Sequence, residues 1–389
     1  MSDTQFPRLL HSFVQDTPPE PDGLWNIPHL WRTATEQNLL PGLAYENKRW
    51  KLFDDPNVCR QLDGLLYGTV AANLNRCVDF ETLSTCFSEH GIAHMPVKGY
   101  YLRKLYPTPE LRTFGDIDLL IHPEDRQKVH DLMLSLGYTV KQDWEPTYSY
   151  IKDAEYYEIH TNLMDGNLDG RTDLQAYFDA AWAHAEPDDG LRFRPEDDFH
   201  FIYTVCHLAK HLYGGGAGLR MYLDVALYVK HKDDSLPWQA IMGEFTALYL
   251  AEFFYTVMNA CRVWFGTKTI CPLPEPDTKV LDRLLSYTLD SDLFGHTRDR
   301  SVVELRNAAK KNSAKDKFLL RMFFPPADEI EQRYTFLKGR HWLLPMAWIL
   351  RFFVNIKLVP KRIRDIRQVT RADAESVSSY DTFMNKIGL

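Results

Sequence analysis

The sequence predicts an α+β protein in which a small mixed sheet lies between an N-terminal helical segment and a larger C-terminal helical domain. Three observations predict this class. Apolar residues recur at helical spacing before residue 91, short alternating segments fill residues 92–163, and helical spacing returns after about residue 165. We therefore expect an N-terminal segment over 1–91, a core over 92–165, a helical domain over 166–360 and a tail over 361–389.

The N-terminal segment is expected to be an irregular arm followed by one long helix. Residues 1–55 carry several prolines between short apolar groups, so we expect only one helix there, near 27–38. Pro56 suits the first turn of a helix, and the helical pattern continues to about Phe87. Gly91 stands where a glycine commonly ends a helix.

The central segment alternates between short strands and short helices. The predicted strands cover residues 92–97, 116–122, 138–141, 147–152 and 156–161. Between them, short helices are predicted over 100–105 and 123–136. The last two strands are expected to form a hairpin that turns at Asp153 and Ala154.

Beyond about residue 165 we expect helices and no further strands. The predicted helices cover residues 196–213, 219–231, 247–265, 277–289, 301–311 and 341–354. A glycine-rich loop, GGGAG at 214–218, separates the first two. The tail carries a basic run over 361–371, which could contact RNA or acidic lipid but is expected to be a solvated face. The residues that follow are polar and are expected to fray.

Composition narrows the class of protein. The chain of 389 residues carries 45 Lys and Arg against 53 Asp and Glu, a net charge of −8, which argues against a general nucleic-acid binder because phosphate contacts need clustered cations. Its 6 cysteines include no CxxC pair and the N-terminus lacks a secretory signal, so we expect reduced thiols and a cytoplasmic location. The apolar stretch 342–356 is shorter than the roughly 20 residues that span a bilayer, so no transmembrane segment is predicted.

A pair of aspartates points to a metal site. Asp116 and Asp118 lie two residues apart in the strand DIDLLIH, so both face the same side, while Ile117 and its alternating neighbours face the core. Adjacent carboxylates repel each other unless a cation offsets the charge. Ligation by oxygen alone favours Mg²⁺, with Mn²⁺ as the alternative.

Further candidates lie on the neighbouring predicted elements. Glu158 lies in the strand YYEIH and would join the two aspartates if the hairpin pairs beside DIDLLIH, and there it could also act as a base. His160 on the same face is expected to have a structural role. Lys98 and Gly99, where a strand gives way to a helix, and Arg112 are expected to hold phosphates.

These residues carry a resemblance. The run VKGYYLRKLYPTPELRTFGDIDLL, followed by YYEIHTNL, resembles the DNA-polymerase-β-type nucleotidyltransferases, and more narrowly a bacterial family of uncharacterised nucleotidyltransferases with a KG…R…DIDLL block, an (E/D)xH strand and a later KH…LR…D pattern. The later pattern corresponds to His207, Lys210 and His211, then Arg220 and Asp224. The resemblance extends loosely over 25–355 and is sharp over 96–120 and 156–162.

The resemblance implies an α/β core that binds two Mg²⁺ ions and transfers a nucleoside monophosphate from an NTP, with ATP favoured, to an unidentified acceptor. Asp116 and Asp118 match the metal-binding pair, Glu158 matches the third carboxylate and Gly99 matches the first motif glycine. One position departs from the wider superfamily, which usually has Gly-Ser where this chain has Gly99 and Tyr100. The phosphate contact of that serine would then fall to a lysine or to a backbone N–H.

The helical domain is expected to complete the nucleotide or acceptor pocket with Lys210, His211 and Arg220. Lys210 could instead lie on a solvated helix face. His207 and His211 lie four residues apart, a spacing that can bind zinc, although the adjacent lysine argues against it. Arg220 and Asp224 have the spacing of an ordinary helix ion pair.

Three other functions stay open at this point. A DxD pair also occurs in metal-dependent glycosyltransferases, but that fold needs several strand–helix units ahead of the pair, and here the preceding segment is mostly helical. A non-catalytic nucleotide sensor or antitoxin-like protein could keep the same fold. A structural or interaction protein could use the apolar residues 342–354 as a docking surface.

Overall fold

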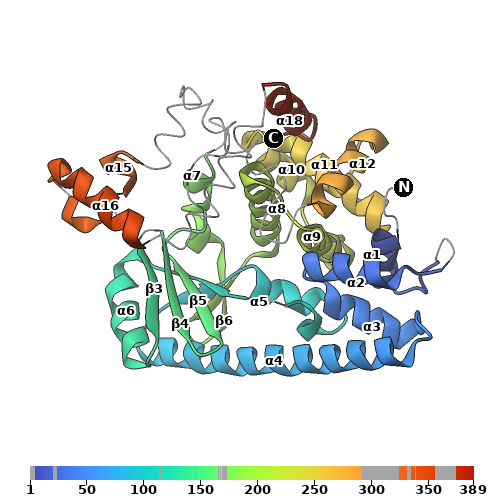
Figure 1. Ribbon diagram of the computed structural model, residues 1–389, viewed down its shortest axis with the longest axis horizontal. Helices are drawn as coiled ribbons and strands as arrows, with labels where there is room; N and C mark the ends of the chain where they lie inside the picture. Colours follow the sequence, from blue (N-terminus) through green and yellow to red (C-terminus); the bar gives the residue numbers. More distant parts are fainter. Residues whose placement is uncertain are drawn as a thin grey trace. The chain divides into compact units, whose positions relative to one another are not determined.

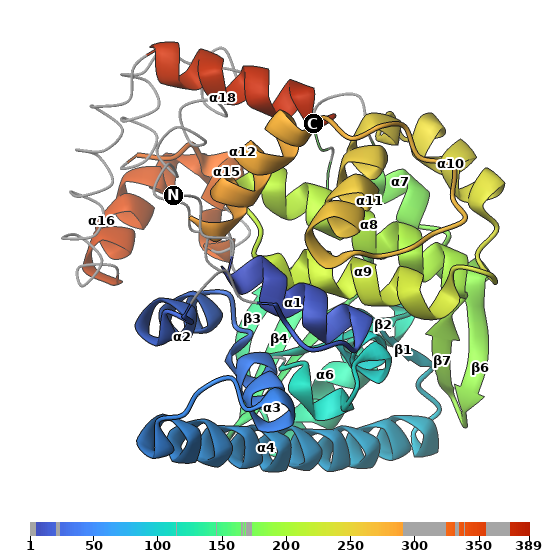
Figure 2. The same cartoon turned by 90° about the vertical axis from the view of Figure 1, so that its right-hand side faces the viewer.

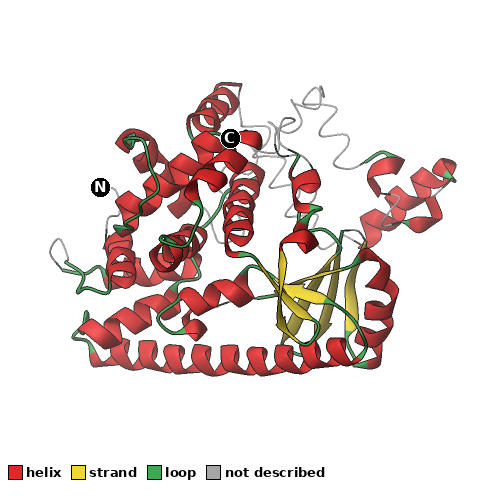
Figure 3. Ribbon diagram, turned by 180° about the vertical axis from the view of Figure 1, so that it is seen from behind, coloured by secondary structure: helices red, strands yellow, loops and turns green. Residues whose placement is uncertain are grey.

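The computed structural model places seven strands of the described chain in one mixed sheet (Figures 1 and 3). The described residues are 5–20, 24–113, 115–144, 146–164, 166, 168, 173–290, 324–330, 334–337, 339–354 and 374–389. By internal contacts the chain divides into a larger unit, 1–295 with 387–389, and a smaller unit, 296–386. The predicted α+β class is confirmed.

The sheet has the order β3-β4-β5-β2-β1-β7-β6. Its strands are β1 (His94–Pro96), β2 (Ile117–Ile121), β3 (Thr139–Trp144), β4 (Thr147–Lys152), β5 (Glu155–His160), β6 (Ala185–Asp189) and β7 (Arg192–Pro195). Neighbours pair antiparallel except for β5 with β2 and β1 with β7, which are parallel. The predicted hairpin is confirmed as β4 and β5.

Helices α4 (Pro56–Glu89) and α6 (Arg126–Ser135) cover one face of this sheet, and α4 packs on it with its C-terminal part (Figures 1 and 2). Asp55 caps α4 by accepting hydrogen bonds from the N–H groups of Asn57 and Val58, and Gly91, at φ +66°, follows its end. The core beneath the sheet consists mainly of Phe80, Leu83, Phe87, Ile117, Leu119, Ile121, Val129, Met133, Tyr150, Tyr157 and Ile159. The polar side chains of β2 and β5 therefore face the other way.

The remaining helices of the larger unit are α1 (Gln5–Gln15), α2 (Ile27–Glu36), α3 (Leu40–Trp50), α5 (Gly99–Leu102), α7 (Leu174–Phe178), α8 (Asp197–Gly214), α9 (Leu219–Lys232), α10 (Trp238–Ala247), α11 (Ala251–Phe265) and α12 (Thr278–Leu289). Single 3₁₀ turns lie at Arg103–Leu105, Pro109–Leu111, Pro123–Asp125 and Ala181–His184. Helices α8 and α9 supply the wall that faces the polar side of β2 and β5.

The smaller unit contains α15 (Ala327–Ile330), α16 (Leu344–Val354) and α18 (Ala374–Lys386), with 3₁₀ turns at Thr335–Leu337 and His341–Leu343. Ile330, Leu337 and Ala347 form its small buried cluster. Trp342 is 77% exposed beside α16. Among the described helices, none is both long and apolar enough to cross a membrane.

Three predictions of secondary structure are wrong. Strands do follow residue 165, because β6 and β7 form a hairpin through Gly190, at φ +58°, and β7 joins β1. Their charged side chains, including the ion pair between Arg194 and Glu186, concealed the strand pattern. The N-terminal arm is not irregular, because its prolines start helices α2 and α3 rather than interrupt them.

The polar tail, expected to fray, forms helix α18 (Ala374–Lys386). The glycine-rich loop after α8 is packed into the protein, with residues 215–218 buried. The predicted helix over 301–311 and the basic run over 361–371 lie outside the described residues.

Candidate functional site

Strands β2 and β5 bring two carboxylates side by side. They pair in parallel with Asp118 directly opposite Glu158 and Leu120 opposite His160. Because side chains alternate along a strand, the apolar residues between them enter the core and these polar groups share the opposite face. The condition on which the sequence argument placed Glu158 beside the aspartates is met.

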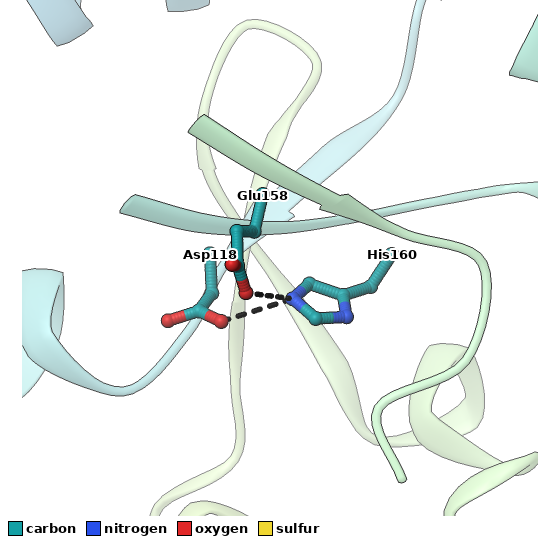
Figure 4. Close-up of side chains that lie close together, drawn as sticks. All are labelled: Asp118, Glu158 and His160. Atoms are coloured by element: carbon teal, nitrogen blue, oxygen red, sulfur yellow. Dashed lines mark hydrogen bonds and ion pairs between the residues drawn. The ribbon is translucent and has the colours of Figure 1, made fainter. Parts of the chain in front are cut away.

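Asp118, Glu158 and His160 form a compact group, with one ligating atom of each within 4.8 Å of the others (Figure 4). His160 Nε2 lies 2.9 Å from Asp118 Oδ1 and 3.8 Å from Glu158 Oε2. On the other side of the ring, Nδ1 lies 3.1 Å from the hydroxyl of Thr147 on β4. The imidazole is therefore held from both sides, and the donor set could hold a divalent cation.

Lys98 brings a cation to the same carboxylate. Its ammonium donates to Asp118 Oδ1 at 2.6 Å, across 20 residues of sequence. Its backbone has φ 48° and ψ −117°, a strained conformation for a residue with a side chain. Burial raises the pKa of Asp118, but Lys98 and His160 outweigh it and hold that pKa below its usual range.

The residues after Lys98 serve different purposes. Gly99 begins α5, which is only 4 residues long, and it lines the pocket described below. Tyr100 instead enters the core, and its hydroxyl donates to Glu81 on α4 at 2.5 Å. The residue that replaces the usual serine thus turns away from the site, so it offers no hydroxyl there.

Asp116 precedes β2 and lines the same pocket, but its carboxylate is not part of the compact group. Burial raises its pKa to about 6, and the negative charge of Asp118 contributes to the increase. Ionising a buried carboxyl group beside another carboxylate is costly, and a nearby cation would lower that cost.

Helix α8 supplies the opposite wall with His207, Lys210 and His211. The two histidines face each other, with their Nε2 atoms 3.0 Å apart. Burial and then the positive charge of Lys98 lower both pKa values, that of His211 to about 4. Both rings are therefore neutral at pH 7, and one donates its hydrogen to the other.

Arg112 and Asp224 form a buried bidentate ion pair. Arg112 Nε and Nη2 each donate to an oxygen of Asp224 at 2.8 Å, and the hydroxyl of Tyr106 donates to Oδ1 at 2.8 Å. Arg112 is 5% and Asp224 3% exposed. Two of the nitrogens with which Arg112 was expected to clamp phosphates are thus engaged by the protein, while the side chain still lines the pocket.

Because Asp224 pairs with Arg112, Arg220, which lies one turn before Asp224 on α9, has a different partner from the one that its spacing suggested. The helix ion pair suggested by their spacing is not what the structure contains, because Asp224 accepts from Arg112 instead. Arg220 Nη1 donates to the carbonyl of Thr113 at 2.7 Å, whereas its buried Nε has no hydrogen-bond partner among the described residues. Burial and then Arg112 lower its pKa to about 10, so the guanidinium stays charged.

One pocket of about 380 Å³ lies between the strands and helices that carry these groups. The residues predicted from the sequence that line it are Lys98, Gly99, Arg112, Asp116, Asp118, Glu158, Lys210, His211 and Arg220. They come from β2, β5, α8, α9 and the segments around them, so distant parts of the sequence meet at one place. Three carboxylates lie on the sheet side, and Lys210 and Arg220 lie on the helix side.

Sequence reasoning undervalued some of the lining residues. His160 and Thr147 lie opposite each other in the β4–β5 hairpin, and the spacing of His160 two residues after Glu158 was the available signal for its place at the site. Asp224 was expected as the last residue of the KH…LR…D pattern or as an ion-pair partner of Arg220, and its pairing with Arg112 was not predicted. Tyr106 had no signal, because its contact with Asp224 spans 118 residues.

Comparison with known proteins agrees with this geometry at the level of family. A family model described as uncharacterised nucleotidyltransferase matches residues 25–266, which is more than half of the chain and includes every lining residue of the pocket. Neither the curated proteins nor the solved structures gave a match. The chain therefore belongs to the uncharacterised nucleotidyltransferase family.

Proposed function

We propose that the pocket transfers a nucleoside monophosphate from an NTP, with ATP favoured, to an acceptor and releases pyrophosphate, in the manner of the DNA-polymerase-β-type enzymes. The observation that carries this is that carboxylates and cations line one pocket, with Asp116, Asp118 and Glu158 at strands β2 and β5, and Lys210 and Arg220 on helices α8 and α9. A metal-bound triphosphate needs both kinds of group at once.

The donor set fits a divalent cation. Asp118 and Glu158 already converge, and Asp116 lines the pocket beside them with a raised pKa. The ammonium of Lys98 now balances Asp118 and would turn from the carboxylate toward the phosphates when the substrate binds. When bound, the cation supplies Lewis-acid stabilisation of the charge that develops on the phosphate oxygens.

Arg220 is the best candidate for the phosphates. Its Nε is buried and has no hydrogen-bond partner among the described residues, so a phosphate oxygen that reached this nitrogen would satisfy it. Arginine is well suited to this because its planar donors match phosphate oxygens. Arg112 would act beside it, held in place by Asp224, and Lys210 and His211 would shape the end of the pocket nearest α8.

The reaction then follows from the arrangement. An acceptor hydroxyl loses its proton to Glu158, and its oxygen attacks the α-phosphorus. The bond from the α-phosphorus to the bridging oxygen breaks, and that oxygen leaves with pyrophosphate, whose charge faces Arg220 and Lys210. The acceptor ends as a phosphodiester or phosphoanhydride of the nucleoside monophosphate.

The test compares NTPs labelled at the α or the γ phosphate, incubated with Mg²⁺ or Mn²⁺ and extracts of small-molecule and protein acceptors. We expect the α label in the product and the γ label in pyrophosphate, with loss of at least about 100-fold in Asp118→Asn. Asp153→Asn is the matched control, because Asp153 lies in the exposed turn between β4 and β5 at φ 51°, which asparagine adopts readily.

Two results would contradict the proposal. Transfer of the γ label would indicate a kinase-type reaction instead. Metal-dependent binding of an NTP with no transfer to any acceptor would favour the non-catalytic sensor.

A further inference from the structure

The compact group at the sheet is not an all-oxygen site. Its members are two carboxylates, Asp118 and Glu158, and the imidazole of His160. Mg²⁺ takes oxygen ligands almost exclusively, whereas first-row transition ions accept imidazole nitrogen with an affinity that starts at Mn²⁺ and rises along the series. A nitrogen in the ligand set therefore changes which cation the site prefers.

His160 is built into this position rather than placed there by chance. Its side chain is buried, and residue 160 lies directly opposite Thr147 in the β4–β5 register. Nδ1 meets the Thr147 hydroxyl at 3.1 Å while Nε2 points at Asp118 and Glu158. Histidines that bind metals commonly have such a partner on the far nitrogen, which sets the ring orientation.

The threonine hydroxyl suits both states of the ring because it can donate and accept. When the ring hydrogen is on Nε2, it donates to Asp118 and the hydroxyl can donate to Nδ1. When Nε2 binds a cation, its hydrogen has left to water and the ring hydrogen lies on Nδ1 instead. The hydroxyl then rotates and accepts from Nδ1–H.

We infer that His160 is a metal ligand, that Thr147 positions it through Nδ1, and that the nitrogen makes this centre select Mn²⁺ over Mg²⁺. The inference rests on the metal site of the proposed function and adds a ligand, a positioning residue and an ion preference to it.

The first experiment is pulsed electron paramagnetic resonance of Mn²⁺ bound to the whole chain. A directly coordinated imidazole gives ¹⁴N modulation of the spin echo, and carboxylate and water oxygens do not. We expect this modulation in the wild-type protein and its loss in His160→Gln. Circular dichroism checks that the variant folds, and the wild-type spectrum remains decisive if it does not.

The second experiment measures Mn²⁺ affinity from the signal of the free ion, with Mg²⁺ as competitor. Loss of a partner that orients a metal-bound histidine costs about 10–100-fold in affinity, so we expect Thr147→Val to weaken Mn²⁺ binding by about that factor. Thr147→Ser, which keeps the hydroxyl, should stay within about threefold of the wild type. His160→Gln should reduce the preference for Mn²⁺ over Mg²⁺ by about tenfold.

Two results would overturn the inference: no ¹⁴N modulation in the wild type, or an unchanged Mn²⁺ to Mg²⁺ ratio in His160→Gln. Its failure is distinguishable from failure of the proposed reaction. If the spectrum shows only oxygen ligands and nucleotidyl transfer is normal, the assignment of His160 as a ligand is wrong and the proposed reaction stands. If the spectrum shows a nitrogen ligand and no NTP supports transfer, the proposed reaction is wrong and the assignment of His160 stands.

Discussion

The buried ion pair between Arg112 and Asp224 allows a quantitative test of how the pocket is held together. Both carboxylate oxygens accept from Arg112 at 2.8 Å, and neither residue is more than 5% exposed. Asp224→Asn keeps the shape but leaves the guanidinium buried without a counter-charge. Breaking such a pair costs about 3–5 kcal/mol of unfolding free energy, and we expect a value in this range.

A double-mutant cycle separates the pair from its surroundings. Arg112→Met leaves Asp224 with only the Tyr106 hydroxyl, so we again expect a loss of about 3–5 kcal/mol. The double variant removes both charges of the pair, so neither is left buried without its partner. Its loss of unfolding free energy should be smaller than the sum of the two single losses by at least about 2 kcal/mol.

The assay is urea unfolding followed by tryptophan fluorescence, with unchanged slopes as the condition for comparison. Glu186→Gln is the control, because it breaks an ion pair with Arg194 whose side chains are 43% and 41% exposed. Exposed pairs contribute about 0–1 kcal/mol. The reasoning is refuted if Asp224→Asn costs no more than this control, or if the losses in the cycle add.

Three further predictions concern single cations and one buried histidine. Arg220→Met should weaken NTP binding about 10–100-fold by calorimetry, since a hydrogen bond to a charged group is worth about 1.5–3 kcal/mol, and equal affinity would exclude a phosphate contact. In the absence of nucleotide, Lys98→Met should tighten Mn²⁺ binding about tenfold, because it frees Asp118 from its ion pair. Lys128→Met, at an exposed lysine, should not change the affinity. Weaker Mn²⁺ binding in Lys98→Met would contradict the competition between Lys98 and the cation for Asp118. Burial lowers the pKa of His94 to about 4, so its contribution to stability is complete above pH 6.5 and is lost as the pH falls toward 4. Between pH 8 and pH 5, the unfolding free energy of His94→Gln in urea titrations should therefore fall by about 2 kcal/mol less than that of the wild type. An identical fall in the wild type and the variant would refute this.

Much of the site's local geometry followed from sequence periodicity. Alternation in DIDLLIH and YYEIH assigned Ile117 and Ile159 to the core and Asp118 and Glu158 to the opposite face, as the structure shows. This succeeds because the direction of a side chain in a strand depends only on its parity. The parallel register that sets Asp118 opposite Glu158 was a condition of the argument, because pairing between strands is not a local property.

The partners of the charged groups could not be predicted in this way. Spacing on a helix suggested Arg220 with Asp224, but Asp224 pairs with Arg112, which lies 112 residues earlier in the chain. Spacing along a helix is a local signal, and it carries no information about a partner that lies 112 residues away in the chain. The same holds for Lys98, whose contact with Asp118 depends on a strained turn after β1.

The sequence by itself determined the α+β class, the long helix that begins at Pro56 and the residue types that could bind a metal and a triphosphate. The spacing of apolar residues and the residues that start or end helices are local signals, and they can be read without knowledge of the fold. Only the tertiary structure decided that β6 and β7 extend the sheet, that His160 lies beside Asp118 and that a buried nitrogen of Arg220 has no hydrogen-bond partner among the described residues. These features depend on which distant groups compete for the same hydrogen bonds, and that competition is resolved only when the chain is packed.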